Sequence, residues 1–373
     1  MRLFEKHPAL RWAVPGAVVA VVLGAGSAVG MLSAAADDTL APRTAAQLLA
    51  DVRQAKFVGV SGTVRQSADL GLPQLPHPAG EGSFSPVSLL SGNHTLRVWY
   101  AGPDKARVAL MGTLGEYDLI RNGDDIWTWD SDKNEATHHR ATEPGTHPMP
   151  APTATMPRTP QEAAEQLLKA VDPTTTVSAD SSVKVAGRNA YELVLAPKDT
   201  GSLVGSVRIA IDGVERIPVR VQVFAKAAAA PAIEIGFTSV SFARPDDAQF
   251  VFTPPPGAKV IEKGAGAERV PGGSVPDMPE ADSQFRQEPS ILGEGWTTVL
   301  VGKLPMKLIA SEGEGASPEG AQLGQIFNAL PRVSGEWGSG RLLSGKLFSV
   351  LLTDDGRLLA GAVSPERLYA VAR

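Results

Sequence analysis

The sequence of 373 residues contains no cysteine. This absence excludes disulfide bonds, thiol nucleophiles, cysteine-ligated zinc or iron–sulfur clusters, and acylation of a lipoprotein-type cysteine. Histidine is also scarce, with six residues, which leaves little material for a histidine-rich metal site. The formal net charge is −5, so the chain lacks the positive excess with which proteins bind nucleic acids. We therefore expect no nucleic-acid partner.

The motifs of the common catalytic classes are missing as well. The sequence has no P-loop, no GxSxG elbow and no HExxH helix. The adjacent His138 and His139 would point to opposite faces of a strand, and the aspartates near Asp124 and Asp130 are explained by turns, which favour this residue type. The sequence therefore predicts a protein that is not an enzyme, with no catalytic residue, no metal and no cofactor.

Residues 1–36 read as an export signal or a membrane anchor. Three basic residues, the last of them Arg11, precede an uncharged stretch from Trp12 to Ala36, and Asp37 follows it. Such a stretch is long enough to cross a bilayer, and its small residues near the end also suit signal-peptide cleavage. Cleavage and retention both stay open. In either case the residues after about 37 are expected outside the cytoplasm. If the segment is retained, the protein lies on a cell membrane with one N-terminal span and its C-terminus outside. If the segment is cleaved, the protein is secreted or periplasm-like.

Residues 37–261 are expected to form a mainly antiparallel sheet with helices. Thr44 and Gln47 have the spacing of a capping box, which predicts a helix start, and Thr159-Pro160 predicts another over 159–171. Period-two alternation predicts strands at 94–100, 107–111, 117–120, 126–129 and across 183–242, with hairpin turns at Asn122-Gly123 and Asp212-Gly213. Successive strands at hairpin spacing favour a meander in an open or closed barrel. Residues 68–93 and the proline-rich 142–160 are expected to be irregular.

The C-terminal part is predicted to be a second unit. Residues 262–290 are rich in Gly, Pro and Glu and read as a linker. Residues 291–373 regain strand and helix patterns, with a hairpin over 345–363, a helix from Ser317 and a short helix after Ser364. About 80 residues suffice for a small α+β domain.

The large apolar face of the first sheet has two interpretations. It is either an ordinary filled core or the wall of an incompletely filled cavity that accepts acyl chains. The alternation leaves open which strand face lines such a cavity, and Trp99, Trp127 and Trp129 on the same strands are interpreted as core. Residues of one parity are the cavity candidates: Val98, Tyr100, Ile126, Leu193, Ile209, Val221, Ile235 and Phe237.

Several segments in order resemble the LolA-type lipoprotein carriers. The resemblance covers about residues 44–260 and is carried by Pro103–Val108, by DLIRNGDDIWTW at 118–129, by IPVRVQV at 217–223, by IEIGFTSVSF at 233–242 and by FVFTPPPGAKV at 250–260. The C-terminal segments GWTTVLVGKLP at 295–305 and LFSVLLTDDGRLLAGAV at 347–363 are similar to the second domain of RseB/MucB-type regulators, which share the same first fold.

The resemblance implies both a fold and a function. The fold is α+β: an incomplete antiparallel β-barrel, or half-barrel, covered by helices, followed by a small C-terminal α+β domain. The function is that of an exported, membrane-tethered carrier that holds acyl chains of lipids or lipoproteins in an apolar cavity. The alternative is an extracytoplasmic sensor of RseB/MucB type, in which residues 291–373 bind a membrane protein such as an anti-sigma factor. The resemblance supplies no catalytic residue.

Overall fold

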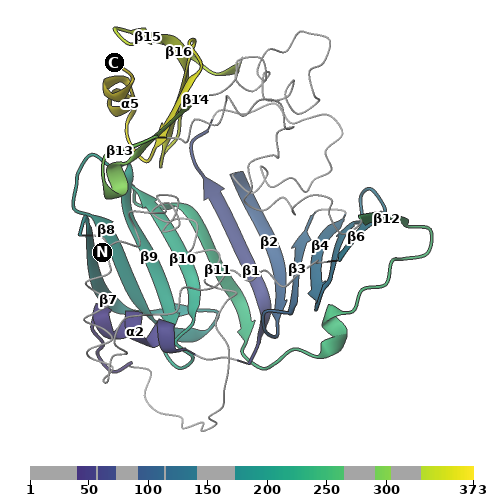
Figure 1. Cartoon of the computed structure of the whole chain (residues 1–373). Coiled ribbons are helices and arrows are strands. Elements are labelled where there is room, and N and C mark those ends of the chain that lie inside the picture. Colours follow the sequence, from purple (N-terminus) through teal and green to yellow (C-terminus); the bar gives the residue numbers. More distant parts are fainter. Residues whose placement is uncertain are drawn as a thin grey trace, which may run out of the picture.

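The computed structural model describes residues 40–55, 58–72, 91–112, 115–140, 173–263, 290–303 and 329–373. These residues form two β-sheets, a large one in the N-terminal part and a smaller one at the C-terminal end, which lies beyond one end of the large sheet's strands (Figure 1). Two α-helices accompany the sheets within the described residues. The described part is therefore mostly β-sheet, and less helical than the α+β class predicted from the sequence.

The large sheet has twelve strands in the order β12-β6-β5-β4-β3-β2-β1-β11-β10-β9-β8-β7. Every pair in it is antiparallel except β12 with β6. β12 and β7 form its two edges, so the sheet is open and does not close into a barrel. The strands are β1 (Val60–Asp69), β2 (Ser91–Tyr100), β3 (Lys105–Met111), β4 (Glu116–Asn122), β5 (Asp125–Asp130), β6 (Glu135–Arg140), β7 (Thr175–Val185), β8 (Arg188–Pro197), β9 (Val204–Asp212), β10 (Pro218–Ala225), β11 (Pro231–Ser241) and β12 (Lys259–Lys263).

Local turn chemistry explains the hairpins of the large sheet. Asn122 pairs with Asp125 across a two-residue loop in which Gly123 has φ +64°, a conformation that glycine adopts without strain. The loop between Asp212 and Pro218 connects β9 to β10. The predicted hairpins at these positions are confirmed. Of residues 68–93, predicted to be irregular, 73–90 lie outside the described residues, while β1 continues to Asp69 and β2 begins at Ser91.

Helix α2 (Ala45–Gln54) begins at the predicted capping box. The Thr44 hydroxyl accepts the N–H of Gln47, and the Gln47 side chain accepts the N–H of Thr44. The helix lies across one end of the strands around β8 (Figure 1), and its fully buried Leu48 belongs to one cluster with Leu193 and Ile211. The helix predicted over 159–171 and the proline-rich residues 142–160 lie outside the described residues. The helix predicted from Ser317 lies outside them too, except for its last residues.

In the part of the chain that the structure describes, no helix is long and apolar enough to cross a membrane. Residues 1–36, for which the sequence predicts an export signal or anchor, lie outside that part. Most of the predicted linker lies outside it too, since the first sheet ends at Lys263 and the second begins at Ser290.

The smaller sheet has six strands in the order β13-β14-β18-β17-β16-β15. Helix α5 (Pro365–Ala372) packs on it through the fully buried Leu368, which joins Leu351 and Leu359 in a separate core. The hairpin predicted over 345–363 is present as β17 and β18. The strands are β13 (Ser290–Leu292), β14 (Val299–Lys303), β15 (Arg332–Gly335), β16 (Gly338–Ser344), β17 (Ser349–Thr353) and β18 (Arg357–Gly361).

A buried ion pair holds the β9–β10 turn. The Asp212 carboxylate is fully buried and accepts two hydrogen bonds from the Arg188 guanidinium, at 2.5 and 3.0 Å, and two from the backbone N–H groups of Val214 and Glu215. Burial by itself raises the pKa of Asp212, but the hydrogen bonds from Arg188 and the two amides outweigh it, so the pKa is lowered.

This lowered pKa predicts an acid-sensitive contribution to stability. Because the folded-state pKa lies below the unfolded value of about 3.9, the contribution is present above that value and is lost as the pH falls through the folded pKa. Asp212→Asn should lower stability at pH 7 and flatten its fall between roughly pH 5 and pH 2. Urea unfolding at a series of pH values measures both effects, and an unchanged pH slope in the variant would contradict the assignment.

Candidate functional site: an apolar hollow

The strand register places all eight predicted cavity residues on one face of the large sheet. Directly paired residues project from the same face of a sheet. Leu193 pairs with Ile209, Ile209 with Val221 and Val221 with Ile235. Phe237 lies two residues after Ile235 on the same face, and it pairs with Val64, which in turn pairs with Leu96. Val98 and Tyr100 alternate with Leu96 on β2 and share its face. From Tyr100 the pairing runs through Ala106 and Arg121 to Ile126. We call this face the apolar face.

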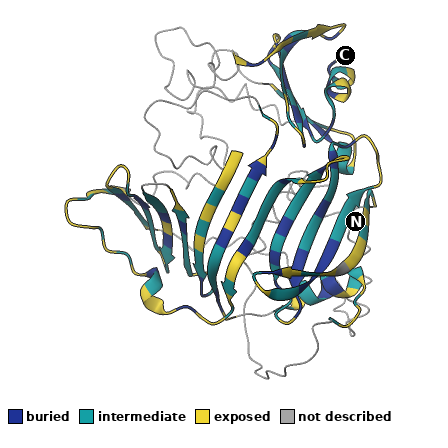
Figure 2. Cartoon of the chain, turned by 180° about the vertical axis from the view of Figure 1, so that it is seen from behind, coloured by how far each residue is buried: buried dark blue, intermediate teal, exposed yellow. Residues whose placement is uncertain are grey.

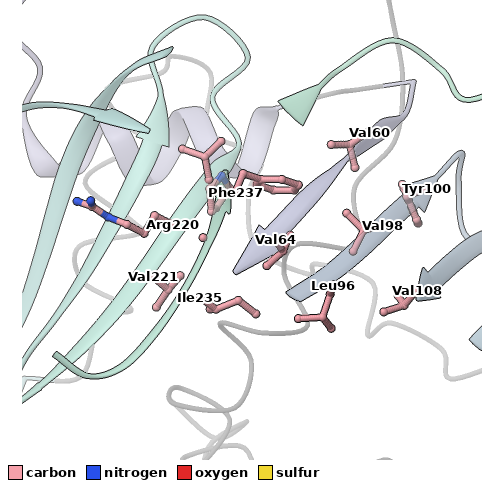
Figure 3. A pocket seen from close by; sticks show the side chains of 13 residues that line it. Val60, Val64, Leu96, Val98, Tyr100, Val108, Arg220, Val221, Ile235 and Phe237 are labelled. Carbon is pink, nitrogen blue, oxygen red and sulfur yellow. The ribbon is translucent and has the colours of Figure 1, made fainter. Parts of the chain in front are cut away.

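A hollow opens on the apolar face where β10, β11, β1, β2 and β3 lie side by side (Figure 3). It contains about 800 Å³ of empty space, part of which is open to solvent. The cavity volume that compares with other proteins' sites is about 160 Å³, below the 300–1,000 Å³ typical of sites for drug-sized molecules, and the rest of the space is open to solvent. Thirteen residues line it: Val60, Val64, Leu96, Val98, Tyr100, Val108, Pro218, Val219, Arg220, Val221, Ile235, Gly236 and Phe237.

The wall of the hollow offers no free charge to a ligand. Its single charged residue, Arg220, donates a hydrogen bond at 3.0 Å to Glu192, so its guanidinium is already paired. Burial raises the pKa of Tyr100, and the nearby Asp104 raises it further, so its hydroxyl stays neutral at physiological pH. The remaining lining residues are aliphatic, aromatic, proline or glycine. Such a wall favours uncharged hydrocarbon over peptides or sugars, whose polar groups would lose their hydrogen bonds to water.

Five of the eight predicted residues are brought together in this wall, namely Val98, Tyr100, Val221, Ile235 and Phe237. Leu193 and Ile209 lie on the same face, but under helix α2 in the cluster of Leu48. Ile126 shares the face on β5 and does not line the hollow. Contact of any of these residues with a ligand stays a prediction.

Several lining residues were not singled out from the sequence. Val60 and Val64 come from β1, and Leu96 and Val108 from β2 and β3. Leu96 has the same parity as Val98, so the alternation contained the signal for it. The two valines of β1 could not be selected, because nothing local shows that β1 pairs with β11, more than 160 residues later.

The hollow is bounded at its two ends. At one end Ala55, which ends helix α2, packs against the cluster that contains Val60, Tyr100 and Phe237. At the other end Val221 belongs to a buried cluster with Leu347 from the small sheet's domain, and Ile235 packs against this cluster. Residues from helix α2 and from the smaller sheet's part of the chain thus pack against clusters that include lining residues of the hollow.

Gly62 lies on β1 between Val60 and Val64 and faces the same side. A Cβ atom built on it would come within 2.2 Å of the Ser239 backbone oxygen and 3.0 Å of the Phe237 ring. The close approach results from a register shift between Thr63 and Val64 in the pairing with β11. Glycine at this position therefore allows the two strands to meet beneath the hollow.

Replacement of Gly62 tests this close approach. Gly62→Ala should destabilise the protein by more than about 1 kcal/mol, since backbone atoms must move to admit the methyl group. Gly302→Ala on β14 is the matched control, because a Cβ there has no heavy atom within 4 Å. Thermal and urea unfolding of both variants checks the prediction, and equal stability of the two would contradict it.

The opposite face of the large sheet carries the tryptophans. Trp99 has the guanidinium groups of Arg97 and Arg107 over its ring at 5.1 and 5.2 Å. Phe252 contacts Trp127 and Trp129, and the neighbouring Phe250, at the end of the short 3₁₀ helix η4 (Asp247–Phe250), is almost completely buried. Buried and exposed positions alternate along β1 (Figure 2), and the residues that β1 and β2 place on this face, such as Arg65 and Thr95, are exposed or half-buried.

Among the described residues, no three His, Asp or Glu side chains lie close enough to hold a metal ion. His138, one of the two adjacent histidines in the sequence, is hydrogen-bonded to Glu262 at 2.8 Å and to Asp125 at 2.9 Å, and its ring stacks on Trp127. Its contacts hold β12 at the sheet edge.

Comparisons with known proteins give similar structures only. No family model matches the chain, and no curated protein matches it in sequence. Among solved structures, the MucA/MucB complex of Pseudomonas aeruginosa is 15% identical, with a TM-score of 0.41, covering 88% of this chain and 96% of that one. A LolA superfamily protein from Nitrosomonas europaea is 9% identical, with a TM-score of 0.20, covering 57% and 99%.

A domain of a putative outer membrane lipoprotein-sorting protein from Vibrio parahaemolyticus is 11% identical, with a TM-score of 0.21, covering 55% and 94%. The similar structures thus include both groups that the sequence resembles. All of these TM-scores are below 0.5, so these similarities carry no argument about function.

Proposed function

We propose that the protein is a non-enzymatic binding protein of the cell envelope that holds hydrocarbon chains of lipids or lipoproteins in the hollow. It acts outside the cytoplasm, held at the membrane by residues 1–36 or released after their cleavage. The observation that supports this most is the composition of the wall, in which twelve of thirteen residues carry no charge and the one guanidinium is paired. Head groups remain in water at the open side.

The binding energy comes from removal of methylene groups from water. Each buried CH₂ contributes about 0.8 kcal/mol, so roughly ten of them supply about 8 kcal/mol before the cost of immobilising the chain. The same wall offers no group that could activate a bond for cleavage, since a hydrolase needs a nucleophile with a base in reach. Binding and release of an intact lipid are therefore the activity proposed.

Titration tests the proposal. The purified protein is delipidated and a fluorescent fatty-acyl probe is added, with native mass spectrometry of the undelipidated protein in parallel. We expect saturable binding of the probe and a co-purified species with the mass of a lipid. Linear, non-saturable partition of the probe, together with a bare protein mass, would rule the proposal out.

A second candidate function concerns the C-terminal domain. We infer a regulatory role in which residues 291–373 bind a membrane protein such as an anti-sigma factor. Support comes from the separate core of this domain and from β15, which pairs with β16 on one side only among the described strands. A photo-crosslinker at the exposed Ser334 of β15 should capture a membrane protein in intact cells, whereas one at the exposed Thr95 of β2 should not. Equal capture from both sites, or from neither, would argue against this role.

A further inference from the structure

The turn between β16 and β17 brings the C-terminal domain onto the apolar face of the large sheet. The backbone N–H of Lys346 donates to the carbonyl oxygen of Leu70, directly after β1, at 2.7 Å. The Lys346 ammonium also forms an ion pair with Asp69 at 2.6 Å. These two contacts fix the turn at the end of β1, on the side of the hollow away from helix α2.

Leu347 is the residue of this turn that enters the apolar cluster. Its side chain is buried, with 6% of its surface exposed, in one cluster with Val207 and Val221, and Ile235 packs against the same cluster. Val221 and Ile235 also line the hollow. Leu347 itself is not among the thirteen lining residues, but Val221 and Ile235 belong both to the wall of the hollow and to the cluster around Leu347, which places Leu347 next to the hollow.

We propose that Leu347 forms the end wall of the hollow and sets the longest hydrocarbon chain that the protein holds. This inference rests on the proposed function and assigns the C-terminal domain a part in ligand selection. The ligand class it predicts is a chain that enters from the open side and points its methyl end at Leu347. A chain shorter than the hollow leaves part of the hollow empty. A longer chain either keeps its extra methylenes in water or must push Leu347 aside.

The end wall predicts a break in the dependence of affinity on chain length. Each methylene that still finds room should tighten binding about fourfold, since its transfer from water is favourable. Once the chain meets Leu347, further methylenes should add almost nothing. Competition of saturated fatty acids of increasing length against the fluorescent acyl probe locates this break in the wild-type protein.

Two substitutions at the wall should move the break in opposite directions. Leu347→Ala removes three carbon atoms and should shift the break to chains about two methylenes longer, so that these chains bind the variant at least tenfold more tightly than the wild type. Leu347→Phe extends the wall and should shift the break to shorter chains. Leu351→Ala, in the separate core of the same domain, is the control and should leave the break unchanged.

The outcomes separate the end wall from the proposed function. If wild-type protein binds no chain of any length, the proposed function fails and the end wall with it. If chains bind but neither variant moves the break, or if Leu351→Ala moves it equally, Leu347 is not the wall. Circular dichroism reports whether Leu347→Ala folds. If it does not, Phe348→Ala, half-buried beside the same cluster, should shift the break in the same direction.

Discussion

Val221→Glu is expected to weaken binding of a fatty-acyl probe by at least a hundredfold. Val221 lines the hollow with 6% of its surface exposed, and no cation among the described lining residues is free to pair with a new carboxylate, because Arg220 already serves Glu192. A carboxylate placed there either keeps water in the hollow, which then cannot leave for the acyl chain, or is buried without its hydration. Each alternative costs several kcal/mol of binding free energy. Ile235→Glu should act in the same way from β11.

The loss of binding must be separated from a loss of folding. Val98→Phe fills part of the hollow with an apolar ring and should reduce probe binding without introducing a charge. Thr95→Glu is the matched control, since it adds the same carboxylate to the exposed opposite face of β2, the strand that carries Val98. Binding that survives Val221→Glu and Val98→Phe, or that Thr95→Glu reduces equally, would show that the hollow is not the site.

Phe250→Ala is expected to have the largest effect on stability, with no effect on the ligand. The ring of Phe250 is 1% exposed, and η4 packs on β3 and β4. Removal of a buried phenyl ring costs about 3–5 kcal/mol, which is a large share of a typical domain's total stability. Because Phe252 and the tryptophans place this packing on the face opposite to the hollow, the folded protein should bind the acyl probe as before.

Urea unfolding and probe titration at low temperature, where the variant is still folded, measure the two effects separately. Val251→Ala is the control, since Val251 is adjacent in sequence and 62% exposed, and it should change neither quantity. A Phe250→Ala protein that folds stably and has lost probe binding would contradict the assignment of the two faces.

Local patterns predicted the parts of the fold that depend on neighbouring residues. The capping box at Thr44 and the hairpins around Gly123 and Asp355 are present where the sequence indicates them, because turn geometry and caps depend on a few adjacent side chains. The parity of the alternation also placed the eight cavity candidates on one face.

Long-range pairing could not be predicted in this way. No local signal shows that β11 inserts beside β1 or that β12 runs parallel to β6, although these pairings decide which strands surround the hollow. Ile126 has the right parity but lies on β5, outside the group of strands at the hollow, and Leu193 lies under α2. Leu347 was not a candidate, since its place at the hollow depends on the packing of two domains.

Photo-labelling with a fatty acid that carries a diazirine near its methyl end tests whether hydrocarbon occupies the hollow. After irradiation of the bound complex and proteolysis, mass spectrometry locates the labelled residues. We expect adducts on residues 218–223 of β10 and 233–237 of β11, and their loss in Val221→Glu. Adducts on residues 247–252 of the opposite face, or labelling spread over the surface without saturation, would contradict this expectation.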